Sequence, residues 1–273
     1  MTKICRSGLA YTDKVVLVTG GSKGIGEGCA RVFVDAGAKV VICARGVEAG
    51  EKLARELSDN GPGSCAFVRC DVSKAEEIVD LVDKTIALHG KLDCLVNNAG
   101  YHPAQSHIDE FSAEDFLDVF RANVLSYFMA AKHGLPHLRK TKGSIINMGS
   151  LVSIIGEYGA STYCATKGAI ASFTKALAIE ESRNGVRVNC VLPGNIKSFG
   201  RVEGGKKSPD PEEFERRLDS HQVTGRSGTN EEVGQLCLFL ASDAASYSTG
   251  TDTIISGGSE IGYGVKYPPT FIE

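Results

Sequence analysis

Seven short apolar runs alternate with helical patterns along almost the whole chain of 273 residues. The runs are rich in β-branched residues and lie at 14–20, 39–45, 65–72, 92–98, 144–150, 186–194 and 251–258. Most of them are continuously apolar, which is typical of strands that helices cover on both faces. Parallel strands need helix-length connections, and the alternation supplies them. We therefore predict an α/β fold with one doubly wound parallel sheet of about seven strands and helices on both faces.

The chain shows no internal repeat and no long linker, so we predict a single domain over residues 1–273. Its one irregular insertion covers residues 197–226, after the sixth predicted strand, and contains GGKKSPDPEEFERR. Gly and Pro punctuate this insertion, and a short helix is expected to begin near Pro211. Another helix is expected after Thr229, because Thr229 and Glu232 have the spacing of a capping box.

The composition argues against several classes of partner. A formal net charge of −3 gives no support for nucleic acid or an anionic membrane as partner. No apolar run approaches the length of a membrane span, and residues 1–14 lack the apolar core of a signal peptide. The nine cysteines are scattered without a C-x-x-C pair, which favours reduced thiols over disulfides or a zinc site. We expect a cytoplasmic protein without a metal, membrane or nucleic-acid partner.

A glycine-rich turn, TGGSKGIG at 19–26, joins the first predicted strand to the helix that follows. Glycine permits a tight turn and a close approach to a pyrophosphate, which then lies at the positive end of the helix. Turns are glycine-rich in general, but this strand–loop–helix setting makes a dinucleotide-binding, Rossmann-type fold the favoured interpretation. The predicted cofactor-binding residues in the turn are Gly20, Ser22, Lys23, Gly24, Ile25 and Gly26.

Four ordered motifs resemble those of the short-chain dehydrogenase/reductase family. They are T-G-x-x-x-G-x-G at 19–26, N-N-A-G at 97–100, Y-x-x-x-K at 163–167 and P-G at 193–194. The resemblance runs from about residue 14 to residue 264, which is nearly the whole chain. It implies an NAD(P)-dependent oxidoreductase that interconverts a secondary alcohol and a ketone by hydride transfer. It also implies a dinucleotide-binding part over 14–195 and a substrate lid over 197–226.

Tyr163 and Lys167 are one helical turn apart, a spacing that neighbours on any helix share. The resemblance makes them a catalytic tetrad with Asn123 and Ser150. In it, Tyr163 exchanges the proton, Ser150 bonds the substrate oxygen and Asn123 orders a water beside Lys167. A free phenol has a pKa of about 10 and is a poor base at neutral pH. Because an ammonium and an oxidised nicotinamide both favour the phenolate, we expect the pKa of Tyr163 to be lowered.

The end of the second predicted strand distinguishes the two nicotinamide cofactors. An acidic side chain there binds the ribose hydroxyls and repels a 2′-phosphate, but this sequence has Ala44 followed by Arg45. Together with Lys23, this pattern favours NADP(H) over NAD(H). The alternative is that both cations are ordinary surface charges, and Arg can also stack on adenine without a phosphate. Asp71 resembles the family residue that bonds the adenine amino group, and a helix cap is its alternative role.

Further cofactor contacts follow from the resemblance at the ends of strands. The backbone of the residue at the Ile196 position pairs with the nicotinamide amide in the family. Ser198 stands where relatives usually carry Thr, and it keeps the hydroxyl. Besides Arg45, the turn residues, Tyr163 and Lys167, the predicted set comprises Asp71, Val72, Asn98, Ala99, Gly100, Pro193, Gly194, Ile196 and Ser198.

A finer resemblance concerns the substrate. The segments NNAGYHP, INMGSLVSIIG, YCATKGAI and SGGSEIGYGVK resemble the 17β-hydroxysteroid dehydrogenases of type 14, which implies a steroid such as estradiol. His102 would then bond the far end of the substrate, and Glu157 would place a negative charge beside it where those relatives carry Gln. Tyr263 would reach the pocket of a neighbouring subunit, and Ser150 and Tyr163 complete the substrate set.

Alternatives to the steroid remain open at this point. They are a reductase of a carbonyl, 3-ketoacyl or sugar substrate in the same family, and a non-catalytic protein that senses the dinucleotide. The family resemblance further implies a homotetramer, with a dimer as the alternative, whose C-terminal tail, residues 257–273, lies at an interface.

Overall fold

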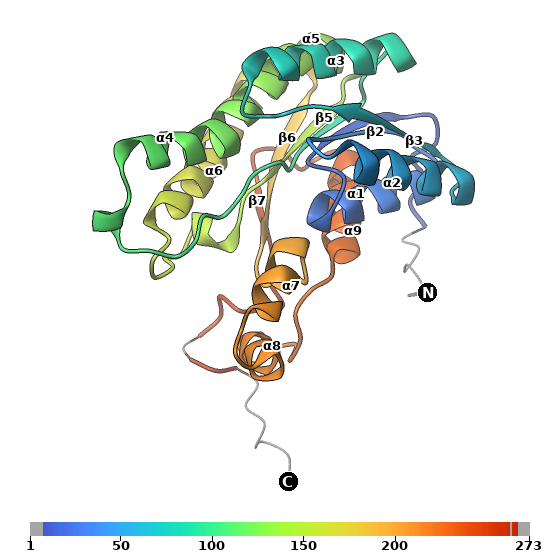
Figure 1. Ribbon diagram of the computed structural model, residues 1–273. Coiled ribbons are helices and arrows are strands. Elements are labelled where there is room, and N and C mark those ends of the chain that lie inside the picture. Colours follow the sequence, from blue (N-terminus) through green and yellow to red (C-terminus); the bar gives the residue numbers. More distant parts are fainter. Residues whose placement is uncertain (1–7, 263, 267–273) are drawn as a thin grey trace.

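The computed structural model describes residues 8–262 and 264–266 of the chain. In this part of the chain seven strands form one sheet in the order β3-β2-β1-β4-β5-β6-β7, with every neighbouring pair parallel (Figure 1). The strands are β1 (Val15–Thr19), β2 (Lys39–Ala44), β3 (Ser64–Arg69), β4 (Cys94–Asn97), β5 (Ser144–Met148), β6 (Arg187–Pro193) and β7 (Asp252–Ile255). The predicted fold class and the seven predicted strands are confirmed. The chain order reverses between β1 and β4, the switch point at which doubly wound sheets bind ligands.

Helices connect the strands and cover both faces of the sheet (Figure 1). They are α1 (Gly24–Asp35), α2 (Val47–Asn60), α3 (Ala75–His89), α4 (Ala113–Phe120), α5 (Ser126–Thr141), α6 (Ser161–Glu181), α7 (Phe199–Lys206), α8 (Pro211–Asp219) and α9 (Asn230–Ala241). Among the residues described, no helix combines the length and apolar character that crossing a bilayer requires.

Successive side chains of a strand face opposite layers of helices. Val16 and Val18 of β1 belong to an apolar core that α1 and α9 complete, and these two helices lie side by side in Figure 1. Val15 and Leu17 belong to a second core on the other face, built with α3 and α5. Because both faces are buried, the four positions from Val15 to Val18 are all apolar, which explains the continuous apolar runs in the sequence.

Two local signals in the sequence define helix ends as expected. Thr229 accepts a hydrogen bond from the N–H of Glu232, whose carboxylate accepts one from the Thr229 N–H, so the predicted capping box precedes α9. Pro211 occupies the first turn of α8, which confirms the predicted start of that helix.

The insertion holds two helices, whereas the sequence predicts only one. α7 has the sequence FGRVEGGK, and its three glycines oppose helix formation. Gly205 is buried, and a Cβ built on it would lie 3.2 Å from the Phe214 ring of α8. Packing against α8 therefore stabilises α7 despite its low intrinsic propensity.

The insertion begins and ends at one place beside the carboxyl end of β6. Ile196 and Gly228 form an isolated parallel bridge. The Lys197 N–H donates to the Gly228 oxygen at 2.9 Å, and the Gly228 N–H donates to the Asn195 oxygen at 3.0 Å. The intervening residues thus form a separate lobe, whose α7 and α8 project from one end of the sheet (Figure 1).

Candidate active site

The turn between β1 and α1 has the shape of a phosphate cradle. Gly20 (φ +66°) and Gly24 (φ +60°) have the left-handed backbone that favours glycine. A Cβ at Gly26 would lie 2.3 Å from the Gly20 oxygen, so no larger residue fits there. Ser22 and Ile25 are partly buried in the same turn. No N-cap side chain bonds the first turn of α1, whose N–H groups remain available to an anion. These features fit the pyrophosphate of a nicotinamide dinucleotide.

The N-N-A-G segment lies against this turn. The Asn98 Nδ2 donates to the backbone oxygens of Thr19 at 2.9 Å and Gly20 at 3.2 Å. The Thr19 Oγ1 accepts from the N–H groups of Asn98 at 2.9 Å and Ala99 at 3.0 Å. Gly100 follows and is exposed. These bonds fix the ends of β1 and β4 to each other at the switch point of the sheet.

The residues predicted to bind adenosine lie after β2 and β3. Arg45 is exposed, and Val72 packs against the core beneath. The Asp71 Oδ1 accepts from the N–H of Ser73 at 3.1 Å and from its hydroxyl at 2.8 Å. Burial opposes ionisation of Asp71, but the bonds from Ser73 and the charge of Arg45 hold its pKa below the usual value. Arg45 and Asp71 therefore interact at one edge of the sheet.

Lys23, the second cation of the predicted 2′-phosphate site, contacts the insertion. Its Nζ lies 4.0 Å from the centroid of the Phe199 ring in the first turn of α7. Its charge also contributes to lowering the pKa of Glu203 on α7, after the larger contribution of Lys206. The contacts of Lys23 in the structure are therefore with α7.

Tyr163, Lys167 and Ser150 meet where β5 ends. Tyr163 lies in the first turn of α6, and the Lys167 Nζ lies 5.6 Å from the centroid of its ring. The same Nζ donates to the Met148 oxygen at 2.7 Å. Ser150 caps the short 3₁₀ turn at Leu151–Ser153 and shares a hydrogen bond with Tyr163. Three members of the predicted tetrad thus converge.

Asn123, the fourth member, lies in a π-helical turn (Arg121–Leu125) between α4 and α5. Its Oδ1 accepts from the Tyr101 N–H at 2.9 Å, and its Nδ2 donates to the Tyr101 oxygen at 2.9 Å. The Nδ2 also lies 3.2 Å from the Thr166 Oγ1 of α6. A Cβ at Gly100 would lie 2.8 Å from the Asn123 Oδ1. Asn123 therefore connects the N-N-A-G loop to α6, through a helical irregularity typical of functional sites.

Burial shifts the pKa values of both Tyr163 and Lys167. Burial raises the pKa of Tyr163 to about 12, and although the bond to Ser150 opposes this rise, the negative charge of Glu157 adds to it. Burial also lowers the pKa of Lys167 to about 8. Within the chain itself, desolvation of the phenol dominates the pKa of Tyr163. The lowering expected beside an oxidised nicotinamide stays a prediction. A lower value requires a further cation, such as an oxidised nicotinamide.

Polar side chains surround Tyr163 on its outer side. The His102 and Tyr163 rings have centroids 4.2 Å apart. The His102 Nε2 lies 3.5 Å from the Glu157 Oε2, and the Glu157 Oε1 accepts from the Gln105 Nε2 at 2.7 Å. Burial opposes a charge on His102, but its bond to Glu157 keeps its pKa above the usual value. Tyr263, predicted to contact a neighbouring subunit's substrate, lies outside the described residues.

The predicted contacts after β6 form a continuous segment. Pro193 ends the strand, and the Gly194 N–H donates to the Ile255 oxygen of β7 at 3.0 Å. Ile196 is buried, and its oxygen accepts from the Ser198 N–H at 2.6 Å. Ser198 is the N-cap residue of α7. This segment joins the catalytic end of the sheet directly to the insertion.

Some residues of the site were not predicted from the sequence. The Thr166 Oγ1 donates to the Tyr163 oxygen at 2.8 Å besides accepting from Asn123. The Ser153 Oγ donates to the Lys167 oxygen at 2.9 Å and accepts from the Ser150 N–H at 3.3 Å. The three-residue spacing of Ser150 and Ser153 is a capping signal that was available in the sequence. For Thr166, its place among small residues suggested packing alone.

Comparison with known proteins identifies the family. A family model described as "Enoyl-(Acyl carrier protein) reductase" matches residues 20–260. The chain is 46% identical to an L-fucose dehydrogenase of Bos taurus, over 95% of this chain and 94% of that protein. The chain belongs to the short-chain dehydrogenase/reductase family. The meso-2,3-butanediol dehydrogenase of Serratia marcescens is 35% identical, over 92% of this chain and 96% of its own length.

Solved structures of this family share the fold. The L-sorbose reductase of Gluconobacter frateurii, complexed with NADPH and L-sorbose, has a TM-score of 0.89 and 29% identity, and the likeness covers 93% of this chain and 99% of that chain. As a short-chain dehydrogenase/reductase, the protein is an oxidoreductase that acts on CH–OH groups with NAD(P). Within residues 8–262 and 264–266, no group of three potential metal ligands comes together.

Proposed function

We propose that the protein is a sugar dehydrogenase that interconverts a hydroxyl and a carbonyl group of L-fucose or a closely related sugar. The observation that carries this proposal is the group of His102, Glu157 and Gln105 at the outer side of Tyr163. A carboxylate, an amide and an imidazole match the many hydroxyls of a sugar, because hydrogen bonds to charged groups are the stronger ones. The similarity to L-fucose dehydrogenases over most of both chains supports the same substrate class.

In the oxidative direction, each residue of the tetrad has a role that follows from its place. A bound nicotinamide cofactor supplies the acceptor or donor of hydride. The Tyr163 phenolate accepts the proton of the substrate hydroxyl, and the Ser150 hydroxyl, which already bonds Tyr163, holds the substrate oxygen. The Lys167 ammonium favours the phenolate form. Asn123 keeps α6 in register with the N-N-A-G loop through Tyr101 and Thr166.

For the cofactor, the proposal is a preference for NADP(H) over NAD(H), with Arg45 as the contact to the 2′-phosphate. Arg45 is exposed at the end of β2, and a guanidinium can bind a phosphate in a bidentate manner. Asp71 beside it supports the adenosine end of the site. NAD(H) is the alternative, with Arg45 stacked on the adenine.

A substrate panel tests the assignment. Initial rates of NADPH and NADH formation are measured with L-fucose, other aldoses, a vicinal diol and estradiol, each with both oxidised cofactors. We expect kcat/KM for L-fucose with NADP⁺ to exceed that for estradiol by at least about tenfold, the size of one or two hydrogen bonds to charged groups. The highest kcat/KM with estradiol, or with a 3-ketoacyl thioester in the reductive direction, would contradict the sugar assignment. A higher kcat/KM with NAD⁺ would contradict the cofactor preference alone.

Glu157→Gln is expected to shift the pH dependence of turnover. Glu157 raises the pKa of Tyr163, so removing its charge lowers that pKa. Oxidation needs the phenolate, so its rate should reach its plateau at a lower pH than in wild type. Reduction needs the phenol, so the decline of its rate with rising pH should also begin at a lower pH. The check is kcat/KM against pH in both directions, with Glu180→Gln on the exposed side of α6 as the control. Profiles identical to wild type would show that Glu157 does not act on Tyr163.

We also propose a cytoplasmic homotetramer with residues 257–273 at an interface. The edge strand β7 supports a subunit contact there, because no strand of the described residues pairs with its outer edge and Ile254 is exposed. Insertion 197–226 is proposed as the substrate lid, since both of its ends lie beside β6.

A further inference from the structure

The insertion touches the glycine turn directly. A Cβ built on Gly24 would lie 3.4 Å from the Phe199 nitrogen and 3.8 Å from the Ser198 Cβ. The Lys23 ammonium lies 4.0 Å from the centroid of the Phe199 ring, on the outer side of this contact. The first turn of α7 therefore lies over the end of α1 where the pyrophosphate of a dinucleotide fits.

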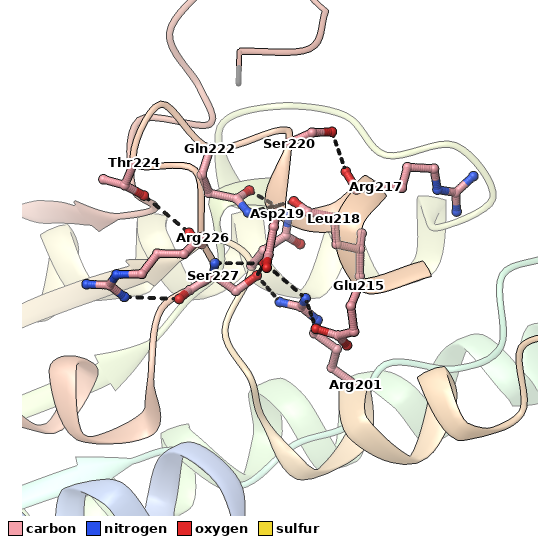
Figure 2. Close-up of polar contacts among 11 residues, drawn as sticks. Arg201, Glu215, Arg217, Leu218, Asp219, Ser220, Gln222, Thr224, Arg226 and Ser227 are labelled. Carbon is pink, nitrogen blue, oxygen red and sulfur yellow. Dashed lines mark hydrogen bonds and ion pairs between the residues drawn. The ribbon is translucent and has the colours of Figure 1, made fainter. Parts of the chain in front are cut away.

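Hydrogen bonds and ion pairs join the parts of the insertion to one another (Figure 2). Arg201 of α7 donates to Glu215 of α8 at 2.7 Å and lies 3.5 Å from the Asp219 carboxylate. It also bonds the Ser227 hydroxyl, and the Ser227 N–H donates to Asp219 at 2.8 Å. The Arg201 side chain is only 9% exposed. These bonds join α7, α8 and the segment around Ser227 that leads back to the sheet. A displacement of Phe199 would therefore displace the whole insertion.

The insertion is bonded to the rest of the protein at several points. Its two ends meet at the bridge between Ile196 and Gly228, the Asn195 Nδ2 donates to the Gln222 Oε1 at 2.8 Å, and the Thr224 N–H donates to the Gly257 oxygen at 3.2 Å. The Asn230 side chain adds a bond of 3.4 Å to the Lys197 oxygen. The contact of Lys23 with Phe199 adds a side-chain link between the glycine turn and the first turn of α7, three residues after the bridge at Ile196.

We propose that Lys23 and Phe199 form a latch that closes the insertion over the bound dinucleotide and sets its residence time. In this role Lys23 is a positioning residue, and it acts equally on NAD(H) and NADP(H). The latch contact is a cation over an aromatic face, which is attractive at this distance. The proposal assigns Lys23 to α7 and leaves the 2′-phosphate to Arg45.

The two possible roles of Lys23 make opposite predictions. A ligand of the 2′-phosphate affects NADP(H) alone, because NAD(H) has no such group. A latch affects the release of both cofactors by the same factor, and its effect depends on the Phe199 ring. Cofactor release without any sugar present separates these roles, so the outcome does not depend on the proposed substrate.

The experiment is a double-mutant cycle on cofactor release, followed by stopped-flow fluorescence of NADH and NADPH displaced by excess oxidised cofactor. The variants are Lys23→Met, Phe199→Leu and their combination. We expect each single variant to accelerate the release of both NADH and NADPH about two- to fivefold, the size of an exposed cation–π contact. The double variant should release no faster than either single one. Lys52→Met on the exposed side of α2 and Phe239→Leu, at a partly exposed position of α9, are the matched controls.

Three outcomes would overturn the latch. They are acceleration of NADPH release alone by Lys23→Met, additive effects of the two substitutions, and unchanged release in every variant. Lys23 is exposed and the Phe199 residue is 47% exposed, so both substitutions should leave the fold intact. Equal melting temperatures of the variants and wild type verify this.

Discussion

Tyr163→Phe is expected to lower kcat by about 10²–10⁴-fold, the usual contribution of one general acid–base group. The substitution removes a single oxygen and keeps the ring, which packs against His102 at 4.2 Å between centroids. Cofactor affinity should stay within about twofold of wild type, because the glycine turn and the strand ends that we propose as the dinucleotide site are untouched. Steady-state rates and a fluorescence titration with NADPH measure the two quantities separately.

Tyr158→Phe is the matched control for this substitution. Tyr158 is 78% exposed, five residues before Tyr163, and its hydroxyl bonds the His107 Nε2 at 2.7 Å. Removing that hydroxyl should leave kcat unchanged. If Tyr163→Phe retained wild-type turnover, another group would move the proton and the assignment of the tetrad would fail.

Lys167→Met is the second substitution with a large expected effect. It keeps an unbranched side chain one atom shorter and removes the charge that lies 5.6 Å from the Tyr163 ring centroid. We expect kcat/KM to fall by about 10²–10³-fold, the range found when one electrostatic contact to the reacting atoms is lost. Unlike Tyr163→Phe, Lys167→Met should also weaken the binding of cofactor. The Lys167 ammonium lies at the carboxyl end of β5, and doubly wound sheets bind their ligands at the carboxyl ends of the strands.

The fold should tolerate Lys167→Met. Burial lowers the pKa of Lys167 to about 8, so the ammonium is held at a cost in desolvation that methionine does not incur. The Met148 oxygen loses its hydrogen-bond donor. The avoided desolvation raises the melting temperature and the lost hydrogen bond lowers it, so the two effects oppose each other. Lys175→Met on the exposed part of the same helix, where Lys175 pairs with Asp252, is the control. A decrease in kcat/KM of equal size in both variants would show that Lys167 has no special role.

The sheet was predictable because its signal is local. Val15, Val16, Leu17 and Val18 are all buried, and a strand buried on both faces is continuously apolar whatever its neighbours are. The same holds for the start of α8, where the Asp210 side chain caps the helix and Pro211 occupies its first turn. α7 could not be predicted in this way, because its stability depends on Gly205 packing against Phe214 in a different helix.

In the candidate active site, too, the features that depend on local sequence could be predicted, and those that depend on tertiary packing could not. The glycine turn is predictable from spacing, since the positive φ angles of Gly20 and Gly24 are demands of the turn itself. The pKa of Tyr163 is not, because its sign depends on how deeply the fold buries the phenol. The contact of Lys23 likewise depends on where the insertion lies, and the insertion has no motif that places it.

The direction of the pKa change also explains why a dinucleotide is central to the chemistry. With the chain's own charges, the phenol stays protonated at neutral pH, since its pKa is about 12. An oxidised nicotinamide bound beside Tyr163 would add a positive charge, and the phenolate of Tyr163 would then be favoured as the base. The enzyme would thus acquire its base only when the oxidant is bound.

The most direct test is a titration of the Tyr163 phenolate by near-ultraviolet difference absorbance, wild type minus Tyr163→Phe, with and without the oxidised cofactor. Without cofactor, we expect no difference signal up to about pH 10, where an ordinary phenol is half ionised. With the oxidised cofactor bound, the phenolate of Tyr163 should appear at a pH about 1–3 units lower than without it. A difference signal that rises at the same pH in both titrations would show that the cofactor leaves the pKa of Tyr163 unchanged. That result would contradict the role of Tyr163 as a base that the oxidised cofactor activates.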